Sequence, residues 1–494
     1  MTKKLNLLIA ASEVWPFAKE GGLADVVCAL AREFEKSGHY VRVVMPKYGL
    51  IDKEGFNLKK LDVILKVHMG VLGIIECALY EWRIPNTNIP IYFIDRKDMY
   101  DLDGGIYADK NGEPYLNNDN RFVLLSRAAL ELCKMLEFKP DIVHAHDWQT
   151  AAIPVFLNTI YKEDTMFRDC ASVLTIHNLQ YQGEFYAGLM DVLGIGRVHF
   201  NAEELEYYGK VNLLKGGINH ADFITTVSEN YASEIQTEEF GFGLNGVLTK
   251  RKDSLIGVLN GVDYELWNPQ TDTYIVQNYS KDELTAKGVC KAALQKHFNL
   301  PQKSHVPFLG LITKLVKQKG IDVFAETVCQ LLEHDIQLAI LGSGETWANF
   351  FFGDLNRRFP GKVGCYIGYD ETLAHQITAG VDLLLMPSRF EPCGLNQMYC
   401  MCYGTLPIVR AVGGLNDTVI NFDEHTMEGT GFKFYELTAE ALLNTINWAM
   451  HIYYNRNEMF KKIMLKAMDM RFTWENSAKR YEEIYFQAIK KKRD

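Results

Sequence analysis

A lysine and two adjacent glycines occupy residues 19–23, between an apolar run at 5–11 and an amphipathic helical pattern. Adjacent glycines let a backbone approach a ligand closely, and the N-terminus of a helix attracts anions. Lys19 adds a full positive charge. The segment therefore favours a phosphate or sugar site at Lys19, Gly21 and Gly22. An ordinary turn between a strand and a helix is the alternative.

A second, denser group of charged residues lies in the C-terminal half. Three lysines follow the apolar run at 308–313, and they are Lys314, Lys317 and Lys319. The segment 387–397 then runs from another apolar stretch into a helical pattern. Backbone N–H groups after Gly394 can hold a diphosphate that the lysines neutralise. Glu391 is a poor phosphate ligand and suits hydroxyl groups, so the two features together predict a nucleotide sugar.

Two further segments place histidines and an aspartate at the ends of predicted strands. His144 and His146 alternate along one strand and so lie on one face, which would suit a metal pair. Because no nearby Cys or third His completes a site, we predict packed histidines and no metal. Asp147, where the strand stops, is the functional candidate. His177 and Asn178 hold the matching position after a later strand, where turn chemistry is the alternative.

Motifs of several nucleotide-dependent enzymes are missing from the sequence. Gly342 and Gly344 begin a GxGxxG pattern, but Trp347 stands in place of the third glycine, which argues against a nicotinamide dehydrogenase. Walker A and HExxH patterns are absent as well. The run GGLND at 413–417 echoes GGLAD at 21–25, and both predict glycine turns that expose backbone N–H groups.

Apolar segments of strand length alternate with amphipathic helical patterns along the chain. The predicted strands are 5–11, 41–45, 89–94, 141–146, 172–177, 223–227, 308–313, 337–341, 363–367, 382–386 and 406–410. Continuously apolar strands separated by helices indicate parallel sheets covered on both faces, and hence the α/β class. The alternation pauses between about 257 and 306, where turn motifs collect.

This pause divides the chain into an N-terminal α/β domain at 1–256 and a second α/β domain at 257–470. Folds of this class bind ligands at the carboxyl ends of their strands. Residues 471–494 form a predicted helix with one apolar stripe. The stripe consists of Trp474, Ala478, Tyr481, Ile484, Tyr485 and Ala488.

Composition narrows the class of protein further. The chain has 494 residues with 52 basic and 62 acidic side chains, a formal charge of −10. This balance argues against binding nucleic acid or anionic lipid by bulk charge. No apolar run is long enough to span a membrane without interruption. The ten cysteines are scattered, so we expect reduced thiols in a cytoplasmic protein.

Seven segments resemble the motifs of bacterial glycogen synthases and plant starch synthases. They are KEGGLADV, VHAHDW, LTIHNLQYQG, GVLNGVD, PSRFEPCGL, YGTLPIVR and GGLNDTV, and they cover essentially the whole chain in order. The resemblance implies the GT-B architecture, in which two Rossmann-like domains face each other across a deep cleft and the last helix returns to the N-terminal domain. It also implies a retaining hexosyltransferase that moves glucose from ADP-glucose to the non-reducing end of an α-1,4-glucan such as glycogen. No cofactor is implied beyond the donor substrate.

The resemblance assigns roles to individual positions. Lys19, Gly21 and Gly22 match the donor loop, which Asp25 supports. Tyr107, Asp147, His177 and Asn178 match residues on the glucose or acceptor side. Asn260 and Asp263 match the segment near the domain crossing. The remaining matches are Lys319 at the donor phosphates, Tyr369 beside adenine, Glu391 at the sugar, and Gly394, Leu395 and Asn396 under the distal phosphate.

Three positions depart from the family pattern. Lys314 stands where the family has Arg, Asn396 replaces Thr, and Gln149 replaces His. The planar guanidinium of Arg can form two parallel hydrogen bonds to phosphate, whereas the ammonium of Lys is a compact point charge. We therefore expect the change at Lys314 to affect activity. Two alternatives follow: a catalytically weakened protein that binds glucan or nucleotide, and a related transferase that uses UDP-glucose or a small acceptor. We expect the lysines to stabilise the leaving diphosphate without a divalent metal.

Overall fold

The computed structural model describes residues 3–494 and divides into two compact units. Unit 1 comprises residues up to Val227, Ala232–Gly261 and Trp474–Asp494. Unit 2 comprises Ser228–Tyr231 and Val262–Thr473. The main crossings from one unit to the other therefore lie between Gly261 and Val262 and between Thr473 and Trp474, whereas the sequence analysis divides the chain at 256 and 470.

Unit 1 is built on a nine-stranded sheet with the order β12-β11-β7-β6-β1-β2-β5-β4-β3. The strands are β1 (Asn6–Ala10), β2 (Tyr40–Pro46), β3 (Lys59–His68), β4 (Ile74–Arg83), β5 (Pro90–Asp95), β6 (Ile142–His146), β7 (Ala171–Ile176), β11 (Phe223–Thr226) and β12 (Leu255–Gly257). Pairing is parallel except at β4, which runs antiparallel to both β3 and β5. A separate three-stranded sheet contains β8 (Glu184–Tyr186), β9 (Glu206–Tyr207) and β10 (Lys210–Asn212).

The helices of unit 1 cover this sheet. They are α1 (Leu23–Lys36), α2 (Gly49–Lys53), α3 (Lys97–Tyr100), α4 (Asn118–Met135), α5 (Asp147–Thr150), α6 (Ala152–Asn158), α7 (Leu189–Leu193), α8 (Leu213–His220), α10 (Asn245–Lys250) and α19 (Trp474–Arg493). Short 3₁₀ turns are η1 (Gly70–Leu72), η2 (Arg197–His199) and η3 (Lys252–Ser254), and α9 (Glu229–Glu234) spans a change of unit.

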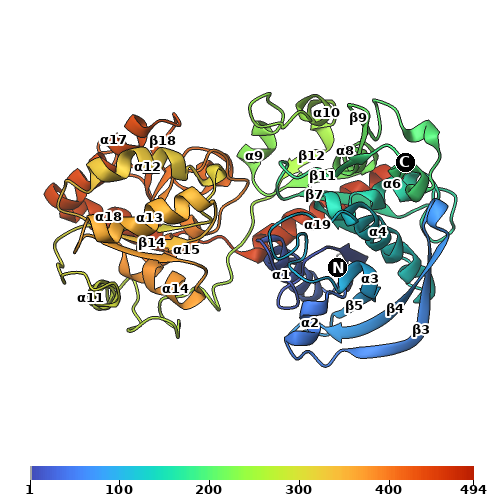
Figure 1. The fold of residues 1–494 in the computed structure, drawn as a ribbon, viewed down its shortest axis with the longest axis horizontal. Coiled ribbons are helices and arrows are strands. Elements are labelled where there is room, and N and C mark those ends of the chain that lie inside the picture. Colours follow the sequence, from blue (N-terminus) through green and yellow to red (C-terminus); the bar gives the residue numbers. More distant parts are fainter. Residues whose placement is uncertain (1–2) are drawn as a thin grey trace. The chain divides into compact units, whose positions relative to one another are not determined.

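The C-terminal helix α19 belongs to unit 1 and packs beside α1 (Figure 1). Its predicted apolar stripe is confirmed, since all six of those residues are buried. The Tyr485 hydroxyl lies 2.7 Å from His144 Nδ1 at the centre of the sheet. The helix thus supplies apolar area to unit 1 and a polar contact to β6, the strand that ends directly before Asp147.

Unit 2 contains a six-stranded, all-parallel sheet with the order β15-β14-β13-β16-β17-β18. The strands are β13 (Phe308–Ile312), β14 (Gln337–Gly342), β15 (Val363–Ile367), β16 (Leu383–Met386), β17 (Leu406–Arg410) and β18 (Phe432–Phe434). The helices are α11 (Thr285–His297), α12 (Ile321–Leu331), α13 (Thr346–Arg358), α14 (Glu371–Gly380), α15 (Asn396–Cys402), α16 (Gly413–Thr418), α17 (Ala439–Asn455) and α18 (Asn457–Asp469), with η4 at Lys317–Lys319.

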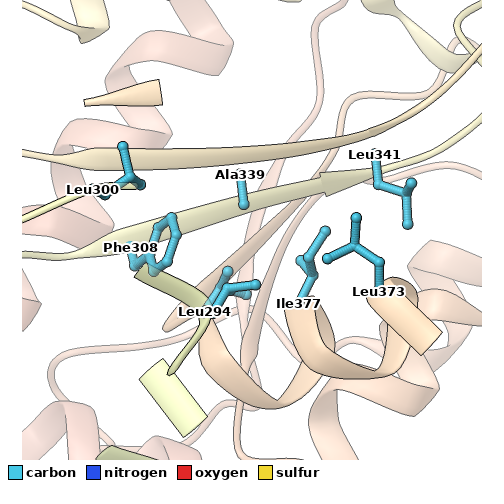
Figure 2. Packing of buried hydrophobic residues seen from close by; sticks show 8 residues of the cluster. Leu294, Leu300, Phe308, Ala339, Leu341, Leu373 and Ile377 are labelled. Atoms are coloured by element: carbon cyan, nitrogen blue, oxygen red, sulfur yellow. The ribbon is translucent and has the colours of Figure 1, made fainter. Parts of the chain in front are cut away.

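One apolar cluster of unit 2 lies between its sheet and two helices. Phe308 of β13 and Ala339 and Leu341 of β14 face Leu373 and Ile377 of α14, and all five side chains are buried (Figure 2). Leu294 of α11 closes the cluster. Ile312, the last residue of β13, packs against the same cluster and so anchors the strand just before the lysines of the second charged group.

All eleven predicted strands are present, within about two residues at each end. The pattern missed the short strands β8, β9, β10, β12 and β18, which have two or three residues each. It also missed the long strands β3 and β4, and β3 is largely solvent-exposed and carries charged residues along most of its length. Antiparallel strands at a sheet edge lack the continuous apolar run that identifies a buried parallel strand. These two strands are far from the candidate residues along the sheet order.

Each of the two large sheets has a topological switch point among its parallel strands, where the chain connections lead away in opposite directions. In unit 1 this point lies between β1 and β6, and in unit 2 it lies between β13 and β16. Loops that leave the carboxyl ends of two such strands diverge to opposite faces of the sheet and leave a crevice for ligands. The loops after β1 and β6 carry Lys19 and Asp147, and those after β13 and β16 carry Lys314 and Glu391.

Candidate functional site

Glu13 organises the glycine loop at the switch point of unit 1. Its Oε2 accepts the backbone N–H groups of Glu20 and Gly21, at 2.6 and 3.0 Å, and its Oε1 accepts the Tyr107 hydroxyl at 2.6 Å. Burial raises the pKa of Glu13, while the bonds from Tyr107 and the loop N–H groups act in the opposite direction. The sequence analysis did not identify Glu13, which follows the first apolar run without any motif of its own.

These hydrogen bonds from the loop to Glu13 change the interpretation of the glycine loop. The Gly21 N–H is bound by Glu13 and is not directed at a ligand in this structure. What Gly21 offers instead is space, because a Cβ built there meets nothing within 4 Å. Lys19 Nζ pairs with Asp25 at 2.8 Å, and the Lys19 side chain is 44% exposed. Exposed pairs of this kind contribute about 0–1 kcal/mol, so Lys19 is readily redirected to an anion.

Asp147 sits where β6 ends and α5 begins, with a positive φ of 53°. Its Oδ1 accepts the backbone N–H groups of His177, at 2.7 Å, and of Asn178, at 3.4 Å. Burial raises the pKa of Asp147 to about 7. The loops after β6 and β7 are therefore joined through one carboxylate, and three predicted residues come together in unit 1.

The histidines of this region form a buried polar group. His146 Nδ1 lies 3.0 Å from His177 Nε2, and burial lowers the pKa of His177 to about 3. His144 uses both ring nitrogens, with Thr175 at 2.6 Å and with Tyr485 of α19 at 2.7 Å. Both nitrogens of His144 are thus engaged by hydroxyl groups, so this residue packs as a core histidine and has no lone pair left for a metal.

Lys319 and Glu391 form an ion pair at the switch point of unit 2. Lys319 Nζ lies 2.6 Å from Glu391 Oε2, which also accepts the Ser388 hydroxyl at 3.1 Å. The Glu391 side chain is 7% exposed and that of Lys319 is 23% exposed. The two residues were predicted for different parts of a donor, phosphate and sugar, and here they place a cation and a carboxylate side by side.

Two glycines allow this pair to form. Gly320 has a φ of +68°, and a Cβ there would lie 1.8 Å from the carbonyl oxygen of Pro387. Gly413 has a φ of +43°, and a Cβ there would lie 1.9 Å from the carbonyl oxygen of Glu391. The N–H of Gly414 donates to that same carbonyl at 3.1 Å. The second GGL run therefore packs directly against the backbone of Glu391 and supports it. In the first GGL run, Gly21 has open space where its side chain would be.

The remaining predicted residues of unit 2 lie on the same edge of its sheet. Lys314 is exposed directly after β13, and Tyr369, 81% exposed, follows β15. Gly394 has a φ of +71°, and Leu395 and Asn396 begin α15. The Asn396 Nδ2 donates to the Ile312 carbonyl at 2.9 Å, so this side chain ties α15 to β13.

The segment with Asn260 and Asp263 spans a boundary between the units. Asn260 belongs to unit 1 and is buried, and within residues 3–494 its Oδ1 has no hydrogen-bond partner. Asp263 belongs to unit 2, where its Oδ1 accepts the N–H groups of Glu265 and Leu266 in a turn. Asp263 therefore stabilises a turn. Asn260 instead presents a buried acceptor that no described residue satisfies.

Comparisons with known proteins agree with this arrangement. A family model described as starch synthase catalytic domain matches residues 6–250, and one described as glycosyl transferases group 1 matches residues 294–464. The chain is 53% identical over 490 residues to glycogen synthase 1 of Geobacter metallireducens, covering 99% of this chain and 97% of that protein. This chain belongs to the glycogen synthase and starch synthase family.

Other members of the glycogen synthase family match over their whole length. The glycogen synthase of Thermosipho melanesiensis is 42% identical, covering 99% of this chain and 100% of that protein. The catalytic domain of starch synthase IV from Arabidopsis thaliana, solved bound to ADP and acarbose, is 32% identical with a TM-score of 0.90, covering 99% of this chain and 100% of that one. The predicted two-domain α/β glycosyltransferase fold is therefore confirmed. Among residues 3–494, no helix is long and apolar enough to cross a membrane.

Replacing Asp147 by Asn should stabilise the fold at high pH and not at low pH. Burial makes the ionised carboxylate costly, and Asn keeps an oxygen that accepts the two N–H groups while carrying no charge. Above pH 7 the wild-type group is ionised, so the melting temperature of Asp147→Asn should exceed that of the wild type at pH 8. The carboxyl of the unfolded chain has a pKa near 3.8, so the difference should shrink as the pH falls below 7 and disappear only near pH 3, where the group is protonated in both states.

The control for this effect is Asp109→Asn. Hydrogen bonds from the Glu113 and Asn111 N–H groups lower the pKa of this exposed carboxyl, so its neutralisation should bring no gain at pH 8. Thermal melts of the three proteins at both pH values make the comparison. Equal shifts for the two variants at pH 8 would show that burial does not penalise the Asp147 charge.

Replacing Gly21 by Ala should weaken donor binding without destabilising the protein. The added methyl enters open space in this structure, but it occupies the space that a ligand needs to approach the loop. We expect KM for the donor to rise roughly 10- to 100-fold with an unchanged melting temperature. Gly246→Ala, at another glycine with open space around its Cβ, should leave KM unchanged. An unaltered KM for Gly21→Ala would show that this loop does not contribute to donor binding.

Proposed function

We propose that this chain is a glycogen synthase that transfers glucose from ADP-glucose to the non-reducing end of an α-1,4-glucan with retention of configuration. The observation that carries the proposal is 53% identity over nearly the whole length of two glycogen synthases, those of Geobacter metallireducens and Geobacter sulfurreducens. The likeness to a starch synthase bound to ADP supports an adenine nucleotide as the leaving group. We place the reaction in the cytoplasm, since all ten cysteines are free thiols, which suits a reducing compartment.

Unit 2 has the chemistry for the donor. Cleavage of the bond from glucose C1 to the diphosphate leaves negative charge on the departing oxygens, which fixed cations stabilise. Lys319, held by Glu391, is such a cation, and Lys314 lies on the same sheet edge. In this proposal the backbone N–H groups that follow Gly394 bind the distal phosphate, and the exposed ring of Tyr369 stacks with adenine.

Glu391 serves two roles in this proposal. Its carboxylate orients Lys319, and its acceptor capacity suits the hydroxyl groups of the departing glucose. A lysine paired with a carboxylate keeps a fixed position and costs little reorganisation when the leaving group develops charge. Because the lysines supply the positive charge, the mechanism we propose uses no divalent metal and no cofactor.

Unit 1 has the chemistry for sugar hydroxyls. Its candidate groups are Tyr107, Asp147, His177 and Asn178, with Lys19 on the glycine loop. The low pKa of His177 keeps its ring neutral at physiological pH, so it exchanges hydrogen bonds with a hydroxyl without adding a charge beside the positive character of glucose C1. Water exclusion around these groups would limit hydrolysis of the donor.

The test is incorporation of labelled glucose into glycogen from ADP-glucose and from UDP-glucose. The proposal expects elongation of glycogen with a marked preference for ADP-glucose. Preference for UDP-glucose would favour the related transferase. Donor binding without elongation would favour a catalytically weakened homologue, the second candidate, which Lys314 in place of the family's Arg supports. Failure to bind either donor would contradict the proposal.

Replacing Lys314 by Arg should raise kcat with ADP-glucose. A guanidinium forms two parallel bonds to phosphate where an ammonium forms one contact, and one charge-assisted hydrogen bond is worth about 1.5–3 kcal/mol, or roughly 10- to 150-fold in rate. Lys303→Arg, at an exposed lysine of unit 2 that pairs with Asp335, is the control and should leave kcat unchanged. An equal or lower kcat for Lys314→Arg would show that the site already compensates for the lysine.

A further inference from the structure

Three potential metal ligands come together in unit 1, away from the strand ends that carry the candidate site. They are His199 at the end of η2, Glu204 in the turn before β9, and His220, the last residue of α8. Their ligand atoms all lie within 4.8 Å of one another. The labels β9 and α8 mark this region in Figure 1. Spacings of 5 and 16 residues across turns give no recognisable motif, which is why the sequence analysis did not identify the cluster.

One carboxylate oxygen faces both imidazoles. Glu204 Oε2 lies 2.6 Å from His199 Nδ1 and 2.9 Å from His220 Nε2. The two rings are 6.1 Å apart between centroids and inclined by 66°. Zinc binds imidazole nitrogen and carboxylate oxygen at roughly 2.0–2.2 Å, so its ligand atoms lie about 3–3.5 Å from one another. Small side-chain rotations bring these three atoms to that spacing.

A neighbouring amide holds the carboxylate in place. Asn201 Nδ2 donates to Glu204 Oε1 at 3.1 Å and to the Val198 carbonyl at 2.9 Å. The bond occupies the second oxygen of the carboxylate and leaves Oε2 directed at the histidines. Metal sites characteristically contain such an outer partner, which orients the ligand without touching the ion.

Exposure and charge also suit a bound cation. The side chains of His199, Glu204 and His220 are 24%, 26% and 13% exposed, so water has access to complete a four-coordinate site. Arg251 is a nearby positive charge that opposes a cation, but its guanidinium is held by the carbonyl groups of Ile218, Asn219 and Ala221 at the end of α8.

We propose that His199, Glu204 and His220 bind a divalent transition-metal ion, with zinc as the best match to two imidazoles and one carboxylate. Magnesium and calcium prefer oxygen ligands and fit this set poorly. The ion would connect η2 and the turn before β9 to the end of α8, so it stabilises the fold of unit 1. This proposal is independent of the proposed function and requires no role in glucose transfer.

The test is a zinc titration of the full, tag-free chain against a chromophoric chelator, with circular dichroism of every variant to verify folding. We expect one equivalent of zinc to bind, the melting temperature to rise, and magnesium not to compete. Cobalt should give the visible absorption of a four-coordinate site. Glu204→Gln, which keeps the shape of the side chain, should weaken zinc binding at least about 100-fold, and Asn201→Ala about 10- to 100-fold.

The control is His305→Ala, an exposed histidine in unit 2, which should bind zinc as the wild type does. Wild-type affinity in Glu204→Gln and in a folded His220→Ala variant would overturn the proposal. So would a wild-type protein that binds no zinc beyond weak surface sites, because the three side chains would then be joined by hydrogen bonds alone.

Discussion

A buried glutamate at each switch point fixes the loops on which the account of this protein depends. In unit 1 the Glu13 carboxylate binds two N–H groups of the glycine loop and the Tyr107 hydroxyl. In unit 2 the Glu391 carboxylate binds Lys319 and Ser388, while its own carbonyl accepts an N–H from the second GGL run. Parallel sheets bring the loops to one edge, and these carboxylates determine which groups of each loop remain available to a ligand.

Burial sets the charge state of the groups around these loops. Asp147 is held near the boundary between its neutral and ionised forms, and His177 is held neutral. A neutral ring and a carboxyl that ionises near pH 7 are suited to hydroxyl groups, whereas the ion pair of unit 2 is suited to a diphosphate. Local electrostatics thus support the proposal that unit 1 contributes mainly groups for sugar hydroxyls and unit 2 the cations for a diphosphate.

Sequence patterns identified the fold and most of the candidate residues, for definite physical reasons. Buried parallel strands are continuously apolar, so strands such as β6 and β13 were found, whereas the exposed edge strand β3 was not. Lys319 and Glu391 are charged residues beside glycine turns, and the sequence predicted each of them separately as a candidate. Their pairing across 72 residues, and the role of Glu13, depend on tertiary contacts that no local pattern contains. The two GGL runs likewise look alike in sequence, but they differ in backbone conformation and in what surrounds them.

The most direct test of this account is amide hydrogen exchange at Glu20 and Gly21 in the wild type and in Glu13→Gln. The loop is exposed, so slow exchange there requires the Glu13 carboxylate. The account predicts protection in the wild type and exchange about 10- to 150-fold faster in the variant, the range for hydrogen bonds to a charged group. The Gly414 amide, bound to the Glu391 carbonyl, should stay protected in both. Unprotected amides in the wild type, or equal rates in the two proteins, would contradict the claim that Glu13 fixes the loop.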